Sequence, residues 1–412
     1  MPNPLNPGAP PMSLTPANLL NRFRALDAFL LAHQPLWRPK PFTELTLPWE
    51  TAHPDLAQWL RTRTLDQAET EHNHPERLAA PAPYPALAAQ AAALSAVPSL
   101  PTGALQPCPP RLKVDVPGRK WQQIEAFADA LTFQHPVTGW LDWCAGKGHL
   151  GRRLLQPGQN LTCYEYDPAL VEAGHALSQH HQLSAEHRLQ NVMAADCHLP
   201  VDKTAVALHA CGDLHVRLLQ RAAADHCRQL AIAPCCYNRT EADQYQPMSE
   251  AAAASNLRLS RDDLGLPLSE TVTAGARVRR QRDQSMAWRL GFDLLQRQAR
   301  GTDQYLPTPS LPSAWLAKPF PDYCNDLAQL KGITLPPATH WPAAEAAGWH
   351  RLANVRNLEG VRNLFRRPLE LWLVLDRALY LQEKGYEVRL GLFCTSHLTP
   401  RNLMLLAQRP KA

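Results

Sequence analysis

One stretch of the sequence decides the fold: residues 141–151 read LDWCAGKGHLG. An apolar run ends in Asp142, small residues and glycines follow, and the pattern then becomes helical. Glycine lets a backbone turn sharply and approach a ligand closely at the carboxyl edge of a parallel sheet. The stretch therefore predicts a strand, a tight turn and a helix, with a ligand at the turn. Such turns also use glycine merely to reverse the direction of the chain. The position of the next acidic residue therefore distinguishes a ligand-binding turn from a purely structural one.

That residue is Glu165, which ends the next expected strand 19 residues after Gly146. At a spacing of about 20 residues a carboxylate reaches the ribose hydroxyls of a nucleoside cofactor. The alternative is a solvated acid at a strand end. The turn lacks the full GxGxxG of dinucleotide sites, and S-adenosylmethionine (SAM) carries no phosphate. The looser turn therefore favours SAM over NAD.

After Pro117, short apolar runs alternate with helical patterns, which predicts a parallel sheet with crossover helices. The expected strands cover residues 139–143, 161–165, 190–194, 205–209, 229–233, 387–394 and 402–408. The expected helices of this region cover residues 120–131, 150–155, 168–180, 214–223 and 368–384. A short link joins the last two strands, which should be antiparallel. The fold class is therefore α/β, with a seven-stranded, doubly wound, Rossmann-like sheet.

Composition suggests how the chain is divided. Its 39 prolines are nearly twice what an average usage of about 5% gives, and much of the excess belongs in linkers. We expect a disordered tail at residues 1–17, a helical N-terminal domain with a Pro-rich linker at 18–110, and a cofactor-binding core at 111–239. Residues 240–365 show no obvious strand series and would form an insertion that recognises the substrate. Residues 366–412 would complete the core.

Two further strand ends carry unusual signatures, HACGD at 209–213 and PCCYN at 234–238. Because the carboxyl ends of the strands face one crevice, both should lie beside the cofactor. Asp196 closes the expected third strand, where its carboxylate could accept a hydrogen bond from an adenine amino group or cap a loop. Methyl transfer from SAM needs chiefly alignment and a route for the leaving proton. His209 or Asp213 could supply that route.

Three motifs, GKGHLG, HACGDLH and APCCYNR, together resemble one group of class I methyltransferases. The group includes the methyltransferase-like half of the glutathione S-transferase C-terminal domain-containing protein. The tRNA 2′-O-methyltransferases that modify the acceptor stem are more distantly similar. The resemblance covers about residues 114–240 and, more faintly, 365–408, and a class I methyltransferase sheet also has seven strands. Where the tRNA enzymes tend to have a His pair, this chain has Tyr237-Asn238, which argues against tRNA but leaves other RNA open.

The resemblance implies SAM as the cofactor and assigns residues to its parts. It puts Asp142, Gly146 and Gly148 around the methionine portion, Glu165 at the ribose and Asp196 near the adenine. Together with neighbouring positions, the expected cofactor-binding residues are Asp142, Cys144, Gly146, Lys147, Gly148, Glu165, Asp196 and His209. The expected residues on the acceptor side are His209, Cys211, Asp213, Cys235, Cys236 and Tyr237.

The cysteines in these motifs allow three interpretations. Cys235 or Cys236 could add to a pyrimidine ring while Cys211 assists release, as in 5-methylcytosine RNA methyltransferases, provided that the thiol pKa is lowered. Together with His209, the three could offer the N and S ligands that zinc prefers, although adjacent cysteines rarely bind one ion. We favour the third interpretation, in which small buried cysteines pack against the strand ends and shape the pocket. No metal is therefore expected.

Arginines gather at residues 277–282 (RVRRQR) and 351–367 (RLANVRNLEGVRNLFRR). Such clusters commonly hold phosphates, although a solvated helix face balanced by acids explains them equally well. The candidate RNA contacts are Arg279, Arg280, Arg362, Arg366 and Arg367. Aromatic residues nearby could stack on bases or lie in the core, namely Trp288, Phe292 and Phe365.

The expected function is SAM-dependent methyl transfer to RNA, either ribosomal or transfer RNA. A net charge of +5 permits an RNA partner without requiring one. Methylation of a protein or small molecule is the alternative within enzymes, and a noncatalytic scaffold with a SAM-binding fold is the alternative outside them.

The chain shows no export or membrane signal. Its start lacks a charged-then-apolar leader, and no stretch reaches the roughly 18 apolar residues of a membrane span. Its ten cysteines form no CxxC pair, so neither a zinc ribbon nor a disulfide framework has the necessary spacing. We expect a cytoplasmic protein with reduced thiols and no membrane partner.

Overall fold

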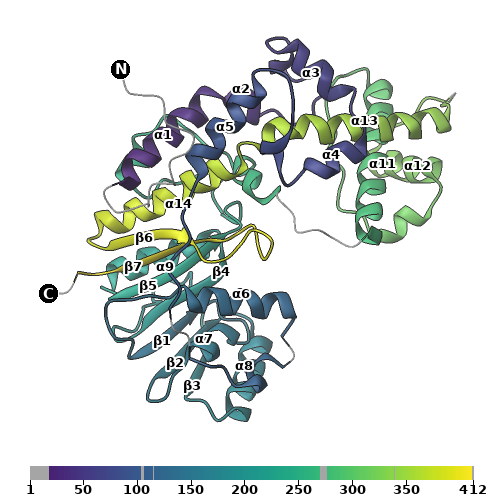
Figure 1. Cartoon of the computed structure of the whole chain (residues 1–412). Coiled ribbons are helices and arrows are strands. Elements are labelled where there is room, and N and C mark those ends of the chain that lie inside the picture. Colours follow the sequence, from purple (N-terminus) through teal and green to yellow (C-terminus); the bar gives the residue numbers. More distant parts are fainter. Residues whose placement is uncertain (1–17, 104–105, 115, 270–275, 338, 411–412) are drawn as a thin grey trace, which may run out of the picture. The chain divides into compact units, whose positions relative to one another are not determined.

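The computed structural model describes residues 18–103, 106–114, 116–269, 276–337 and 339–410. The expected disordered tail, residues 1–17, lies outside them. The chain forms two compact units: residues 1–31, 93–268 and 368–412 make one, and residues 32–92 and 269–367 make the other. We call them the sheet unit and the helical unit; Figure 1 labels their elements. None of the described helices combines the length and apolar character needed to cross a membrane.

The sheet unit is built on seven strands in the order β3-β2-β1-β4-β5-β7-β6. The strands are β1 (Gly139–Trp143), β2 (Asn160–Glu165), β3 (Ala185–Leu189), β4 (Thr204–Cys211), β5 (Gln229–Cys235), β6 (Glu387–Leu392) and β7 (Leu403–Gln408). The first five run parallel, and β7 is antiparallel to both β5 and β6. The strand order reverses between β1 and β4, which is the switch point where open α/β sheets bind ligands. The predicted fold class is confirmed.

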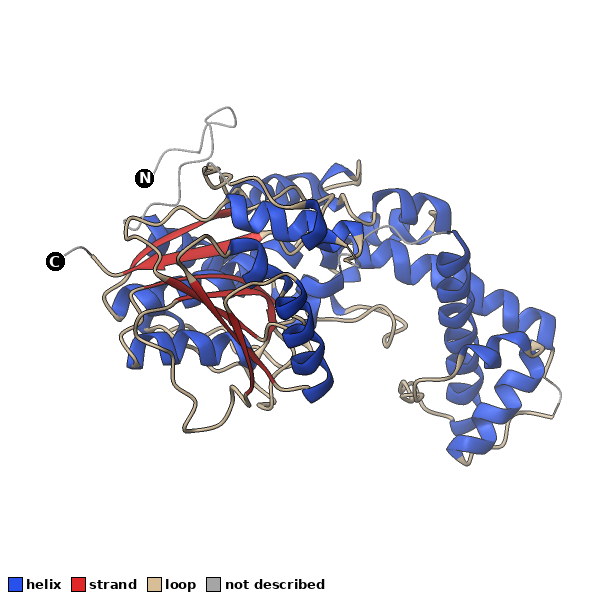
Figure 2. Ribbon diagram, turned by 90° about the horizontal axis from the view of Figure 1, so that it is seen from below, coloured by secondary structure: helices blue, strands red, loops and turns tan. Residues whose placement is uncertain are grey.

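Helices cover both faces of this sheet, as Figure 2 shows. The helices of the sheet unit are α1 (Leu19–Ala32), α6 (Gly118–Asp129), α7 (His149–Leu154), α8 (Pro168–His180), α9 (Asp213–Ala224), α10 (Glu250–Ala253) and α14 (Arg366–Glu383). Short 3-10 helices lie at Pro110–Lys113 and Asp263–Ser269. One face packs Trp140, Leu161 and Val206 against α6 and α7. On the other, α9 lies along β4 and β5. Both faces of the central strands are buried, which explains their continuous apolar runs.

The third strand is β3, Ala185–Leu189, rather than the predicted 190–194. That prediction was wrong because β3 is an edge strand, bonded only to β2, and its sequence AEHRL is largely polar and exposed. An apolar run is expected only where a strand is buried on both faces. Residues 192–196 instead form a turn, so Asp196 does not close a strand.

The N-terminal region is divided between the two units, which differs from the separate helical domain expected at 18–110. Helix α1 belongs to the sheet unit, where the Phe23 and Trp372 rings lie 5.1 Å apart. Asp27 Oδ1 accepts hydrogen bonds from Trp372 Nε1 at 2.9 Å and from Ser255 Oγ at 2.5 Å. Residues 32–92 belong with 269–367, so the expected N-terminal domain and the expected insertion share one unit.

The helical unit contains α2 (Gln34–Trp37), α3 (Pro54–Arg61), α4 (Leu65–Glu71), most of α5 (Tyr84–Ser95), α11 (Ala276–Arg300), α12 (Phe320–Lys331) and α13 (Trp341–Asn363), with short turns at Pro48–Glu50, Pro75–Arg77 and Ser313–Ala317. Helices α11 and α13 approach closely where Gly291 meets Gly348, since a Cβ on Gly348 would lie 3.0 Å from Gly291 Cα. Trp288 and Phe292 are 5% and 1% exposed in this unit's core, and Phe365 is fully buried. All three aromatic side chains therefore serve packing rather than base stacking.

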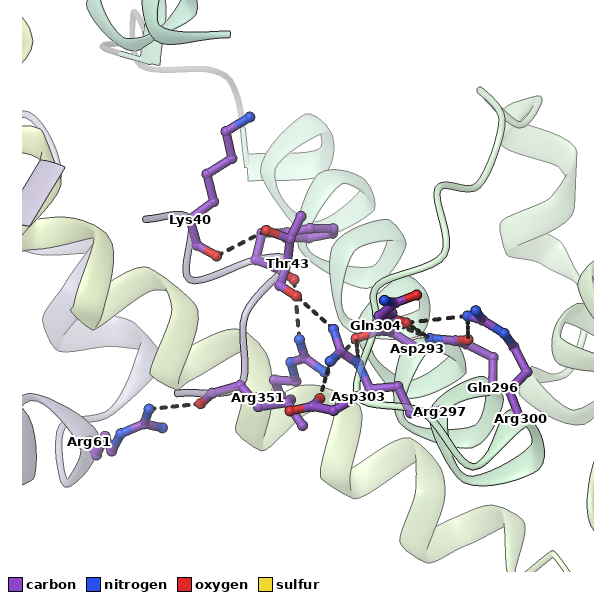
Figure 3. Close-up of polar contacts among 12 residues, drawn as sticks. Lys40, Thr43, Arg61, Asp293, Gln296, Arg297, Arg300, Asp303, Gln304 and Arg351 are labelled. Carbon is purple, nitrogen blue, oxygen red and sulfur yellow. Dashed lines mark hydrogen bonds and ion pairs between the residues drawn. The ribbon is translucent and has the colours of Figure 1, made fainter. Parts of the chain in front are cut away.

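A buried carboxylate joins these two long helices, as Figure 3 shows. Asp293 Oδ2 accepts a hydrogen bond from Arg297 Nε at 2.9 Å and one from Arg351 Nη1 at 2.6 Å. The same guanidinium groups reach backbone carbonyls of an early loop, at Thr43 (2.6 Å) and Phe42 (3.2 Å). A buried charge needs such partners, because an unpaired one carries a desolvation cost of several kcal/mol.

Candidate functional site

The glycine turn after β1 opens onto the carboxyl edge of the sheet. Gly146 has φ +55°, and a Cβ there would meet nothing within 4 Å, so the space beside it is open. Its N–H donates to Glu165 Oε2 at 2.8 Å. The other oxygen, Glu165 Oε1, accepts from the N–H groups of Tyr166 (2.8 Å) and Asp167 (3.0 Å). The acid at the end of β2 therefore points toward the glycine turn, as the spacing of 19 residues predicts.

Asp142 lies behind that turn, 3% exposed. Its Oδ2 accepts a hydrogen bond from the N–H of Gly151 in α7 at 2.9 Å. Burial raises the pKa of Asp142 to about 7, opposed by the hydrogen bond from Gly151. The carboxylate fixes the start of α7 against the end of β1 and so sets the shape of the turn.

The two remaining residues of the turn differ in exposure. Cys144 is half-buried with φ +56°, and burial raises its pKa to about 12, so this thiol stays protonated. Lys147 is exposed, and its carbonyl accepts from Arg152 Nη1 at 2.5 Å. Arg152 is itself 3% exposed, and its Nη2 contacts His149 Nδ1 at 3.1 Å. Arg152 holds the loop through its hydrogen bond to the carbonyl of Lys147. Sequence reasoning missed it, although it lies within the motif GKGHLGR.

The expected adenine contact, Asp196, lies on an exposed turn after β3, whereas the sequence predicted it at the end of the third strand. Three large apolar side chains at the same edge are also exposed: Tyr166 by 71%, Leu189 by 60% and Met193 by 41%. Tyr166 directly follows Glu165, and Met193 lies on the turn of Asp196. Such side chains can cover the faces of a purine ring, and sequence reasoning missed them because they lie at the end of a strand or in the loop after it.

Three thiols meet at the ends of β4 and β5. Cys211 and Cys235 are register partners, and their Sγ atoms lie 3.6 Å apart. The Sγ atoms of Cys211, Cys235 and Cys236 all lie within 4.8 Å of one another. Hydrogen bonding from the Cys235 thiol lowers the pKa of Cys236 to about 6 and also lowers that of Cys211. Cys235 keeps its proton, since donation to both neighbours and burial raise its pKa.

A buried network holds both of these strand ends in place. His215 Nδ1 donates to the carbonyl of Ala210 at 3.0 Å, and His215 Nε2 accepts from Arg377 Nε at 2.7 Å. Burial, and secondly Arg377, lowers the pKa of His215 well below its ordinary value, so the ring is neutral. The Tyr237 ring packs edge-on to His215 with centroids 5.9 Å apart, and the Arg377 guanidinium lies 5.2 Å from its centre. The network was missed because Arg377 is 162 residues from His215.

Tyr237 was expected on the acceptor side, but it is 2% exposed and its hydroxyl points to the carbonyl of Pro234 at 3.5 Å. It therefore supports the strand end from within. Asp213 begins α9, and its Oδ2 accepts from the N–H of Glu241 at 2.9 Å, which ties the loop after β5 to the loop after β4. Asp213 is half-exposed, and its expected role on the acceptor side stays a prediction.

His209 is half-buried at φ +66° near the end of β4. Its Nε2 lies 2.7 Å from the side-chain oxygen of Gln123, whose Nε2 donates to the carbonyl of Leu398 at 3.2 Å. This orientation of the amide requires His209 Nε2 to carry the proton, which leaves a lone pair on Nδ1. Burial lowers the pKa of His209, so the neutral ring can accept a proton there.

The five arginines predicted to contact RNA have different environments. Arg366 is 4% exposed and donates to the backbone carbonyls of Asn363 (3.2 Å) and His72 (2.6 Å). Arg362 Nε donates to a backbone carbonyl at 2.7 Å. Arg279 and Arg367 are half-buried, whereas Arg280 is exposed on α11. Of the five predicted arginines, Arg362 and Arg366 therefore already bind backbone carbonyls of the protein.

The strand order, the glycine turn and Glu165 together are typical of a site for a nucleoside cofactor. The family comparison points to the same kind of site. Residues 119–243, from α6 through β5, match the family model described as a methyltransferase domain. The segment resembles methyltransferase domains. The match supports the expected enzyme class, a SAM-dependent methyltransferase, and SAM as the expected cofactor. The match does not distinguish the subgroup that the three motifs resemble. No curated protein sequence matches the chain.

Several solved methyltransferases are similar to parts of the chain. The tRNA (uracil-54, C5)-methyltransferase of Pyrococcus abyssi, in complex with S-adenosyl-L-homocysteine, is 16% identical over 28% of each chain, with a TM-score of 0.23. The 23S rRNA methyltransferase ErmE is 14% identical over 57% of this chain and 96% of its own, with a TM-score of 0.25. Coclaurine N-methyltransferase bound to N-methylheliamine and SAH is 12% identical over 85% of this chain and 90% of its own, with a TM-score of 0.26. The match covers 42% of a putative sarcosine dimethylglycine methyltransferase from Galdieria sulphuraria and 53% of a geranyl diphosphate methyltransferase.

Proposed function

We propose that this chain transfers the methyl group of SAM to RNA, at an acceptor held beside the carboxyl ends of β4 and β5. The observation that carries the proposal is the cluster of thiols at these two ends, next to the glycine turn in the strand order. A pyrimidine carbon is a poor nucleophile until a thiolate adds to the neighbouring ring carbon; after methyl transfer, loss of the proton from the methylated carbon to a base would expel the thiolate again. Cys236 has the lowered pKa that such an addition needs. Paired strand-end cysteines therefore suit a nucleobase acceptor.

The cofactor would lie along the edge from β1 to β3. The turn at 144–148 would surround its methionine portion, and Glu165 would accept hydrogen bonds from the ribose hydroxyls. Tyr166 and Met193 would flank the adenine, with Asp196 within reach of its amino group. His209 Nδ1 would accept the proton released at the acceptor. The three motifs also support the subgroup that includes the methyltransferase half of the glutathione S-transferase C-terminal domain-containing protein.

Phosphate contacts would come from the exposed arginines at the start of α11, Arg277 and Arg280. Exposed guanidinium groups neutralise phosphates and release counterions, so RNA affinity should fall as salt rises. Arg362 and Arg366 are excluded from this role by their bonds to backbone carbonyls. The proposal therefore rests on fewer arginines than the sequence suggests.

The test is incubation of the full chain with methyl-labelled SAM and separate RNA, protein and small-molecule fractions from cells lacking the gene. We expect label in RNA, dependent on Glu165, and none in the other fractions. A double Arg277→Gln/Arg280→Gln variant should weaken RNA binding and reduce the magnitude of its salt dependence by about two phosphate contacts. A matched control is Arg188→Gln, an exposed arginine on β3 paired with Glu186.

Label in the protein or small-molecule fraction would replace RNA as the acceptor while leaving the methyltransferase chemistry in place. A folded chain that fails to bind SAM in calorimetry would instead support the noncatalytic scaffold. Each outcome therefore identifies which part of the proposal fails.

A further inference from the structure

We propose that Cys211, Cys235 and Cys236 together bind a thiophilic divalent cation such as Zn²⁺. In the part of the chain that the structure describes, these three sulfur atoms are the group of His, Cys, Asp or Glu ligand atoms that converge closely enough to hold an ion. This departs from the sequence-based expectation of no metal. The proposal does not depend on RNA being the acceptor, but it gives Cys236 a different role: an ion bound by all three sulfurs would occupy the thiolate that would otherwise add to a pyrimidine ring.

The spacing of the sulfur atoms fits a common ion. Zinc binds cysteine sulfur at about 2.3 Å in tetrahedral geometry, which places two sulfur ligands about 3.8 Å apart. Cys211 Sγ and Cys235 Sγ are 3.6 Å apart, and the third sulfur completes a triangle with no side longer than 4.8 Å. Side-chain rotation alone can close the remaining difference.

The main objection is that adjacent residues seldom bind one ion, because successive side chains of a strand point to opposite faces. The backbone removes this objection. Strand β5 ends at Cys235, and Cys236 has φ +46°, a left-handed conformation that is costly for a residue with a side chain. This conformation brings the sulfur of Cys236 back to the side of the other two. The carbonyl of Cys236 accepts the N–H of Arg239 at 2.9 Å, so a backbone turn holds this conformation in place.

The backbone around the three thiols is also fixed before any ion binds. Cys211 and Cys235 are locked by the register of β4 and β5. His215 holds the carbonyl of Ala210, and the Tyr237 hydroxyl points to the carbonyl of Pro234, so the residue before each strand-end cysteine is held. Groups held in this way lose little conformational entropy on binding a ligand.

Access and coordination number indicate what kind of site this would be. Cys235 is buried, but Cys211 and Cys236 are half-exposed, so an ion has a route from solvent. His209, which the sequence suggested as a fourth ligand, is not part of the converging group, because neither of its ring nitrogens lies within 4.8 Å of all three sulfur atoms. Three protein ligands with one open position are typical of zinc sites that bind water or a substrate atom, whereas structural sites have four. The open position would face the acceptor side.

The test uses the full, reduced chain titrated with Co²⁺ and with Cd²⁺, whose thiolate complexes absorb visible and ultraviolet light. We expect charge-transfer absorption that saturates at one ion per chain and the release of protons, because thiols must ionise to bind. Cys211→Ser and Cys236→Ser should each weaken binding by more than about tenfold, since even indirect partners of metal ligands contribute 10- to 100-fold. Zn²⁺ should displace Co²⁺, and Cd²⁺, which prefers thiolates more strongly, should displace Zn²⁺.

The matched control is Cys108→Ser, which removes a half-exposed thiol distant in sequence from the three cluster cysteines. It should leave the titration unchanged. Circular dichroism of both cluster variants checks that they fold. Absence of thiolate absorption in the fully reduced wild-type chain would overturn the proposal. Wild-type absorption in both serine variants would overturn it as well. Calorimetry with SAM on the same samples tests the cofactor site separately, so that the two proposals can fail independently.

Discussion

Replacement of Glu165 tests the cofactor site most directly. In the structure its carboxylate accepts three backbone N–H groups, from Gly146 at 2.8 Å, Tyr166 at 2.8 Å and Asp167 at 3.0 Å. These bonds fix the direction of both oxygens before SAM binds. We expect Glu165→Ala to bind SAM far more weakly than the wild-type chain does.

The size of the loss follows from counting acceptor sites. A carboxylate has about four lone-pair directions, and three are already used. One direction is free for a ribose hydroxyl, and a second becomes available if the hydroxyl replaces the N–H of Gly146. A hydrogen bond to a charged group contributes about 1.5–3 kcal/mol. One to two such bonds give a loss of about 1.5–6 kcal/mol, or at least about tenfold in Kd. Glu165→Gln keeps one accepting oxygen and should lose less.

The assay is isothermal titration calorimetry with SAM and with S-adenosylhomocysteine, on protein whose fold is checked by circular dichroism. The matched control is Asp167→Ala, two residues away on the same loop. Asp167 Oδ1 caps α8 by accepting from the N–H of Ala169 at 2.8 Å, so its removal should cost about 1 kcal/mol of stability and leave SAM affinity within threefold. A folded Glu165→Ala chain that binds SAM within threefold of wild type would refute the ribose assignment.

Three further predictions concern stability, each measured by urea unfolding. Arg377→Met should destabilise the chain by about 2 kcal/mol, because it leaves Nε2 of the buried His215 without its donor; an unchanged midpoint would contradict this. Burial raises the folded-state pKa of Asp142 to about 7, so the folded chain holds a proton that the unfolded chain has released, and wild-type stability should fall by up to about 4 kcal/mol as pH rises from about 4 to 7. Asp142→Asn should flatten that fall, and equal slopes for both proteins would be the contrary result. Gly212→Ala should abolish folding or cost more than about 3 kcal/mol, since its Cβ would lie 1.8 Å from a carbonyl oxygen, whereas Gly118→Ala, with open space around it, should be neutral.

The sequence predicts the sheet well where the strands are buried on both faces. Strand β1 was predicted at its observed bounds, and β5 begins where expected, because both are continuous apolar runs. Strand β3 was misplaced because an exposed edge strand carries no such run. Apolar periodicity reports burial, so it locates only those elements that are buried.

The site was predictable to the extent that it is local in sequence. The glycine turn and Glu165 are 19 residues apart, and their contact through the N–H of Gly146 follows from the strand-turn-helix order. The convergence of the thiols was not predictable in the same way, since it depends on the backbone conformation of Cys236. Sequence patterns carry no signal for a left-handed residue other than glycine or asparagine.

Two supports of the thiol cluster, β7 and Arg377, come from outside the matched methyltransferase segment. Residues 119–243 contain every predicted cofactor-binding residue, yet they lack β7, which pairs with β5 from Gln229 to Ile232. All seven residues of β5 are buried, so the segment alone would leave a long apolar edge strand open to solvent and to other chains. It would also lack Arg377, the partner of His215. Residues 269–367 of the helical unit are inserted between β5 and α14, so the ends of β4 and β5 gain these two supports only from residues 368–412.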